Sequence, residues 1–449
     1  MKTLYLVSLG CPKNLVDSEV MLSALEKDGY TPVEQPEAAT LLLVNTCGFI
    51  QPAVEEAIDV ILELAACKEQ NPTVRLVVTG CMVQRYGHSL LDELPEVDLF
   101  VGLDDFPRIT QLLATETVLP NLSVNPGAAT YLMDSSVTRR IATPFFRSYL
   151  KITEGCDNYC AYCMIPSIRG RLRSRTITDL LVETQALERS GVRELSLIAQ
   201  DLTAYGTDRT GDTEDLVTLL ATLLDETALP WFRLLYLYPT TVSDALLQLM
   251  AAQNRLLPYL DIPFQHVSGR ILTRMNRHYD CSMLDDLIDR IRRYLPECAL
   301  RTTLMVGFPG ETEQDVDLMA EALEAWQLAH VGVFQYQDEE NSIAATFSGK
   351  VANEVKAARY QRIMEIQAAI SAQLQQRYVG RVEPVLIEGV SDESDLLLAG
   401  RTRFQAPDID GCVYITAGEV HPGAIVPVRI TEAHTYDLVG EVHSVEEER

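Results

Sequence analysis

Short apolar runs and helical patterns alternate along the first hundred residues. The runs lie at Leu4–Val7, Leu41–Val44 and Leu76–Val78, and they are typical of strands buried on both faces of a parallel sheet. Helical patterns separate them at Ser18–Asp28 and Ala53–Lys68. The alternation predicts an amino-terminal α/β domain with a parallel sheet, over residues 1–118.

A second series of the same kind follows a loop rich in Pro, Asn and Gly between Pro120 and Gly127. The strand candidates are Tyr149–Thr153, Glu194–Ala199, Phe232–Leu237, Tyr259–Phe264, Arg301–Val306 and Val331–Tyr336. The helical patterns between them are Thr176–Arg189, Glu214–Leu224, Ser243–Gln253, Met283–Tyr294 and Glu313–Trp326. Six strand and helix units predict an incomplete (β/α)6 barrel of the TIM type over residues 142–377, with its catalytic face at the carboxyl ends of the strands.

The remaining residues change character. A long helical pattern at Val351–Tyr378 leads into short alternating runs broken by Gly, Asp and Pro, which predict a small all-β module over residues 378–446. The fold class is therefore α/β with this third module, and a chain of 449 residues fits about three domains of roughly 150 residues each.

Composition narrows the partners and the compartment. A formal net charge of -27 disfavours a bare nucleic acid or membrane surface as the main partner, and no apolar run reaches the length of a membrane span. The segment Met1–Cys11 superficially resembles a lipoprotein signal, but its apolar stretch is short and one Lys precedes it. We expect a cytoplasmic protein, whose ten cysteines serve metal binding or catalysis rather than disulfides.

Three of these cysteines, Cys156, Cys160 and Cys163, share one short loop after the first barrel strand. Three thiolates leave one iron of a [4Fe-4S] cluster without a protein ligand, free to chelate the amino and carboxylate groups of a cofactor. A structural zinc site is the alternative, but zinc requires a fourth ligand and the sequence nearby offers none.

A second set comes from the amino-terminal domain. Cys11, Cys47 and Cys81 each follow closely after one of its apolar runs. Because the carboxyl ends of parallel strands share one edge, where ligands bind, these cysteines are predicted to converge although they lie far apart in the sequence. Cys67, Cys281, Cys298 and Cys412 show no metal-like spacing and are expected to be ordinary thiols.

Other polar or glycine-rich segments end predicted barrel strands and are candidates for cofactor binding. The candidates are Gly307, Gly310 and Glu311 after the fifth strand, Gln265 and His266 after the fourth, Gln200 and Asp201 after the second, and Arg175 in a run with Arg169, Arg171 and Arg173. Each has a plainer explanation: a glycine-rich turn, a structural histidine, or a solvated or salt-bridged basic face.

The cysteine loop, with Tyr162 just before its last cysteine and a barrel behind it, resembles the radical S-adenosylmethionine superfamily. The resemblance implies that S-adenosylmethionine is cleaved to methionine and a deoxyadenosyl radical, which abstracts a hydrogen atom from an unactivated carbon. It also implies that Tyr162 lies in the cofactor site.

The amino-terminal cysteine set is similar to that of the methylthiotransferases, and this resemblance covers essentially the whole chain. It implies a second [4Fe-4S] cluster on Cys11, Cys47 and Cys81, where a sulfur is methylated and then transferred, while Cys156, Cys160 and Cys163 hold the radical cluster. It also implies a TRAM-type, OB-like module at the carboxyl end.

Local sequence favours the branch that modifies an aspartate of ribosomal protein S-twelve over the branch that modifies transfer RNA adenosine. The segments from Ser8 to Glu19, from Gln200 to Gly206 and from Ala406 to Gly411 resemble the ribosomal-protein branch. Charge agrees, since residues 378–449 carry 5 Arg and no Lys against 14 Asp and Glu, a formal charge of -9. An acidic module suits a basic protein better than an RNA backbone, although acidic surfaces also serve solubility.

The leading hypothesis is methylthiolation of the β-carbon of that aspartate by a monomeric enzyme, with a low-potential donor such as flavodoxin or ferredoxin and a sulfur source that the sequence does not reveal. Two alternatives stay open. One is methylthiolation of a transfer RNA adenosine, and the other is a non-catalytic iron-sulfur or zinc protein that binds ribosomes.

Overall fold

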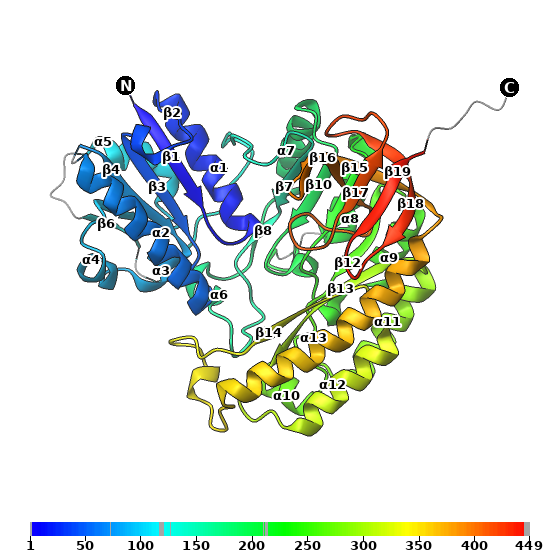
Figure 1. Ribbon diagram of the computed structural model, residues 1–449. Helices are drawn as coiled ribbons and strands as arrows, with labels where there is room; N and C mark the ends of the chain where they lie inside the picture. The colour runs from blue at the N-terminus through cyan, green and yellow to red at the C-terminus, as the bar shows by residue number, and fades with distance from the viewer. Residues whose placement is uncertain are drawn as a thin grey trace.

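The computed structural model describes residues 2–71, 73–115, 121–125, 127–209, 211 and 214–443. Figure 1 shows an amino-terminal α/β body in blue, a curved sheet with outer helices in green and yellow, and a small β-barrel in orange and red. The predicted domain limits at residues 118 and 446 lie outside the described residues. No helix in the described ranges is long and apolar enough to cross a membrane.

The amino-terminal sheet is parallel, with strand order β2-β1-β3-β4-β5-β6. Its strands are β1 (Thr3–Ser8), β2 (Thr31–Pro32), β3 (Leu41–Thr46), β4 (Arg75–Gly80), β5 (Leu99–Val101) and β6 (Asn121–Ser123). The helices of this domain are α1 (Pro12–Lys27), α2 (Gln51–Gln70), α3 (Cys81–Tyr86), α4 (Ser89–Glu93) and α5 (Ile109–Ala114). Apolar side chains of α1 and α5 pack on one face of the sheet, and those of α2 and α3 on the other. Helices on both faces explain why the strands are apolar throughout.

The second sheet is also parallel and open, with strand order β14-β13-β12-β11-β10-β7. Its strands are β7 (Arg147–Lys151), β10 (Glu194–Ile198), β11 (Trp231–Leu234), β12 (Leu256–Asp261), β13 (Ala299–Val306) and β14 (His330–Gln335). The outer layer holds α7 (Ile177–Arg189), α8 (Leu216–Glu226), α9 (Asp244–Ala252), α11 (Cys281–Tyr294), α12 (Glu313–Trp326) and α13 (Asn353–Gln375). This arrangement confirms the predicted incomplete barrel.

Short elements surround the carboxyl ends of the barrel strands. They are the helices α6 (Ile165–Ile168) and α10 (Gly269–Arg274) and the antiparallel pair of β8 (Thr153–Glu154) and β9 (Arg173–Ser174). The predicted cysteine loop lies between β8 and α6, so the fold places it at the expected end of the barrel.

The carboxyl-terminal module is a closed barrel of β15 (Val382–Ser391), β16 (Ser394–Thr402), β17 (Val413–Ala417), β18 (Ile425–Ala433) and β19 (Leu438–Val442). The loop after β16 packs against the concave face of the large sheet. There Asp408 accepts two hydrogen bonds from Arg147 at 2.8 and 2.9 Å, and Asp410 accepts one from Tyr259 at 2.7 Å. Because Arg147 begins β7, the module fills the amino-terminal end of the concave face and leaves the carboxyl ends to the site.

Candidate functional site

The first cysteine set meets at one edge of the amino-terminal sheet. Cys11 caps α1, Cys47 follows β3 and Cys81 begins α3, and the strands before them are neighbours in the sheet. Gly10 permits a close approach, since a β-carbon added there would lie 2.7 Å from the Cys47 Cβ. The structure thus brings the three residues together, as the strand topology predicts.

Burial and mutual proximity disfavour free thiolates in this set. Burial raises the pKa of Cys81 to about 12, with a lowering contribution from Arg169 and raising ones from Cys11 and Cys47. Burial also raises the pKa of Cys47. These thiols are therefore neutral until a cationic metal group binds the thiolate form and displaces the proton.

Arg169 connects this edge to the barrel. Its Nε lies 3.4 Å from the Cys81 sulfur, and its two terminal nitrogens lie 3.0 Å from Glu154 and 3.0 Å from Asp17. Lys151, also buried, pairs with Asp17 and with Glu154. Two cations and two carboxylates therefore form a compensated buried network between the two domains.

The second cysteine set is held by backbone contacts and by Arg277. Cys163 N donates to Cys160 O at 3.0 Å, and Cys156 N donates to Gly170 O at 3.1 Å. Arg277 lies 3.6 Å from the Cys160 sulfur and 3.2 Å from the Tyr162 hydroxyl. This arginine was not predicted from the sequence, because it lies more than 100 residues from the loop.

A further contact stabilises the start of the loop. Asn158 donates to Asp201 at 2.7 Å, while the other oxygen of Asp201 accepts from Ala204 N at 3.2 Å. Gln200, its neighbour, donates to Glu154 at 3.0 Å. The polar residues that end β10 thus position the loop and the buried network.

The donor chemistry of both sets suits iron-sulfur clusters better than single ions. In the part of the chain that the structure describes, no group of three or more His, Cys, Asp or Glu side chains is arranged to hold one metal ion. A cluster spreads its thiolate ligands over different irons, so the sulfurs need not meet at one point. Burial raises the pKa of Cys156 to about 11 and also raises that of Cys163, so a metal group that binds their thiolate forms displaces a proton from each.

The glycine-rich turn after β13 is accounted for by contacts within the fold. Glu311 accepts two hydrogen bonds from Gly307 N, both at 2.9 Å, and pairs with Arg359 of α13 at 2.8 Å. Gly307 faces the Lys356 side chain, and Gly310 N donates to Gly349 O at 2.7 Å. A role of these residues in cofactor binding stays a prediction.

Gln265 and His266 follow β12, where they were expected. His266 is fully buried, and its Nδ1 accepts from Val267 N and Ser268 N, both at 2.9 Å. Its Nε2 lies 3.5 Å from Glu311. Gln265 has a positive φ of 68° and bonds through its backbone to β13. The histidine therefore has structural partners, and the contact of either side chain with a cofactor stays a prediction.

The basic run divides into different roles. Arg175 is buried and pairs with Asp179 at 2.7 Å and with Glu183 at 2.6 Å, so the salt-bridged explanation describes its contacts. Arg171 is 79% exposed and pairs with Asp157 at 3.3 Å. Only Arg169 of this run reaches a predicted cysteine ligand among the described contacts.

Lys13 lies between Cys11 and the carboxyl end of β10. Its Nζ donates to Ala199 O, at the end of β10, at 2.9 Å and lies 3.8 Å from the centre of the Tyr236 ring. Burial lowers its pKa, opposed by the charge of Cys11. Asp261, which ends β12, is also buried, and burial raises its pKa to about 6. The sequence alone did not identify Lys13 or Asp261 as a candidate site residue.

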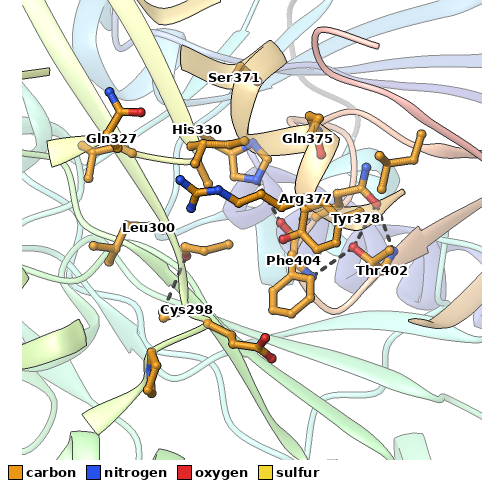
Figure 2. A pocket seen from close by; sticks show the side chains of 18 of the residues that line it. Cys298, Leu300, Gln327, His330, Ser371, Gln375, Arg377, Tyr378, Thr402 and Phe404 are labelled. Atoms are coloured by element: carbon orange, nitrogen blue, oxygen red, sulfur yellow. Dashed lines mark hydrogen bonds between the residues drawn. The ribbon is translucent and has the colours of Figure 1, made fainter. Parts of the chain in front are cut away.

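A cavity of about 230 Å³ lies at the other end of the barrel. Figure 2 shows His330, Tyr378, Thr402 and Phe404 around it, where β13, β14, the end of α13 and the carboxyl-terminal module meet. None of the six predicted cysteine ligands lines this cavity. It is a gap between packed domains, separate from the candidate site.

Comparison with protein families divides the chain as the fold does. Residues 3–102 match the uncharacterized protein family UPF0004, residues 150–323 match the radical SAM superfamily, and residues 379–442 match the TRAM domain.

Curated relatives match the chain over nearly its whole length. The ribosomal protein uS12 methylthiotransferase RimO of Desulfotalea psychrophila is 52% identical over 442 residues, which are 98% of this chain and 99% of the relative. The protein of the same name from Geobacter sulfurreducens is 46% identical over 439 residues, 98% of each chain.

Solved structures share the fold at low identity. The radical S-adenosylmethionine methyltransferase TsrM from Kitasatospora setae, with cobalamin and a [4Fe-4S] cluster bound, superposes with a TM-score of 0.53 at 14% identity, over 86% of this chain and 81% of that one. The cobalamin-dependent S-adenosylmethionine radical enzyme OxsB gives a TM-score of 0.50 at 12% identity, over 82% of this chain and 56% of that one. These matches support the fold alone.

Proposed function

The chain belongs to the family of ribosomal protein uS12 methylthiotransferases, and on that premise we propose that it attaches a methylthio group to the β-carbon of an aspartate of this ribosomal protein. The observation that carries the proposal is the arrangement of the cysteines. Cys11, Cys47 and Cys81 lie at one strand edge, and a loop with three further cysteines follows β8 on the barrel side of the buried Arg169 network.

Each cysteine set holds one [4Fe-4S] cluster in this proposal. The radical set is Cys156, Cys160 and Cys163, and the auxiliary set is Cys11, Cys47 and Cys81. Once bound, S-adenosylmethionine and the clusters would supply the methyl group and the radical that removes a hydrogen atom from the substrate carbon, and the auxiliary set would hold the sulfur while it is methylated.

The side chains around the two sets hold the thiolates in place. Arg277 fixes Cys160 and Tyr162 from the barrel side, and Arg169 offers a positive charge to Cys81. Both arginines are buried, so their charges act at short range with little screening by water. The carboxyl-terminal module covers the amino-terminal end of the concave face, opposite the cysteine loop.

The partners follow from the proposed chemistry. A basic ribosomal protein is complementary to the acidic carboxyl-terminal module, and such complementarity speeds encounter more than it raises affinity. We propose a monomeric enzyme of the cytoplasm, reduced by a donor such as flavodoxin or ferredoxin. None of the contacts described above identifies a sulfur donor.

The function is tested by the intact mass of ribosomal protein uS12 from cells with and without this gene, with transfer RNA nucleosides from the same cultures as the control. The expected result is a mass lower in the mutant by the replacement of one hydrogen by a methylthio group, with unchanged nucleosides. An unchanged protein mass with an altered nucleoside would contradict the proposal and favour the transfer RNA branch.

A further inference from the structure

The two buried lysines between the domains differ in their partners. Lys151 is paired with Asp17 and, at 2.9 Å, with Glu154. Lys13 is buried as well, yet within the described residues its Nζ makes no ion pair with any carboxylate. An ammonium group has three donors, and the carbonyl of Ala199 and the face of Tyr236 occupy only part of this capacity.

A buried charge without an opposite charge is costly, and proteins retain it where a ligand supplies the missing partner. The interface does contain carboxylates, those of Asp17 and Glu154, and both pair with Lys151. Asp261 interacts with Lys13 electrostatically, but its own contacts are with Tyr236 N at 3.3 Å and Arg301 at 3.7 Å. No carboxylate of the described residues pairs with the Lys13 ammonium, whose largest favourable charge interaction is with Cys11, so a substrate anion would be its first direct ion-pair partner.

The residue that covers Lys13 has an unusual backbone conformation. Tyr236, whose ring covers the ammonium, has a φ of 67°. A tyrosine in this left-handed region is strained, and such strain persists where the surrounding structure enforces it, commonly at functional sites. The Tyr236 carbonyl accepts from Leu202 N at 2.8 Å, and this bond holds the backbone of the strained residue in place.

The position of Lys13 indicates which anion it would bind. Lys13 lies two residues after Cys11 and contacts the carboxyl end of β10, so it stands between the auxiliary cysteines and the catalytic face of the barrel. A side chain that receives a methylthio group from the auxiliary set and loses a hydrogen atom to the radical formed at the other set must enter this space. We propose that Lys13 binds the carboxylate of the substrate aspartate and thereby selects aspartate over its uncharged amide; this inference rests on the proposed function.

The test uses the cluster-loaded full-length enzyme and two fluorescent peptides with the sequence around the target aspartate of uS12, one with Asp and one with Asn at that position. Equilibrium anisotropy should show that the wild-type enzyme binds the Asp peptide about tenfold to a hundredfold more tightly, the range of one charge-assisted hydrogen bond. Lys13→Met should remove this preference, and Lys13→Arg should retain part of it. Lys27→Met, an exposed lysine of the same helix, should leave the preference unchanged.

Competing outcomes are distinct. If Lys13 instead balances the charge of the auxiliary cluster, Lys13→Met will lower the iron content or alter the electron paramagnetic resonance of that cluster without peptide, and the Asp preference will persist; this result overturns the inference. If the wild-type enzyme modifies the Asp peptide but Lys13→Met keeps the preference, the inference alone fails. If the wild-type enzyme modifies neither peptide nor intact uS12, the proposed function fails with it.

Discussion

The Nε atom of Arg169 lies 3.4 Å from the sulfur of Cys81, although 88 residues separate the two in the chain. The arginine follows α6 beside the cysteine loop of the barrel, and Cys81 begins α3 in the amino-terminal domain. The same guanidinium contacts Asp17 of α1 and Glu154 of β8. One buried side chain therefore connects the auxiliary cysteine set to the barrel domain.

Replacement of Arg169 tests this link. Arg169→Met leaves the buried carboxylates of Asp17 and Glu154 with Lys151 alone, and breaking such a network typically costs about 3 to 5 kcal/mol. Urea denaturation of the variant should show this loss, with reduced iron content at the auxiliary set. Arg171→Met, whose parent side chain is 79% exposed, is the control and should change stability little. Equal stability of the two variants would refute a structural role for the network.

The cysteine sets are expected to divide the reaction between them. Cys163→Ala should abolish reductive cleavage of S-adenosylmethionine, measured as deoxyadenosine, because its loop would hold the radical cluster. Cys11→Ala should retain cleavage but form no methylthiolated peptide. Cys67→Ala, outside both sets, should behave as the wild type. Loss of cleavage in both ligand variants to the same extent would contradict the division.

The sequence predicts the apolar framework of this protein well. The predicted strands of both parallel sheets appear where the apolar runs lie, because burial on both faces leaves a plain signal. The short strands β2, β5 and β6 were not predicted. The helix expected from Ser18 begins at Pro12 instead. Its first turns carry Lys13, Asn14 and Asp17, polar residues that are nonetheless buried against the barrel, so their pattern imitates a surface loop.

The site was predictable in its cysteines and not in its supporting residues. The roles of the cysteines follow from their spacing and from the predicted strand topology, and both can be inferred from the amino-acid sequence. Arg277 and Lys13 act across more than 100 residues of sequence, at Cys160 and Ala199. Such partners depend on tertiary packing, within the barrel for Arg277 and between the domains for Lys13, and no local pattern distinguishes them from surface cations. Glu311 shows the opposite case, since the expected turn is present but its carboxylate bonds within the fold.

The docking of the carboxyl-terminal module should depend on pH through Glu194. Burial alone would raise the pKa of this carboxyl, but Arg401 and Arg233 outweigh it and lower the pKa from 4.5 to about 2. A depressed folded-state pKa contributes stability that is complete above the unfolded value and is lost as pH falls from about 4.5 through about 2. The shift corresponds to about 3 kcal/mol at neutral pH.

Glu194→Gln measures this contribution. Denaturation at pH 7 should show the variant to be less stable by about 3 kcal/mol, and the difference from the wild type should shrink as the pH is lowered toward 3. Glu419→Gln, at an exposed position of the carboxyl-terminal module, should match the wild type throughout. A difference that stays constant from pH 7 to pH 3 would show that the ion pairs of Glu194 are not its source.

Two glycines with the same backbone angle separate local strain from damage to the auxiliary site. Gly10 and Gly29 both have a φ of 88°, but an added β-carbon meets the Cys47 Cβ at 2.7 Å in the first case and nothing within 4 Å in the second. Each substitution by alanine costs about 1 to 2 kcal/mol of left-handed strain. Gly10→Ala should in addition displace Cys47, so that the variant binds less iron and transfers no sulfur while it still cleaves S-adenosylmethionine. Gly29→Ala should lose stability alone, and normal iron binding by both variants would show that Cys47 does not need its close contact with Gly10.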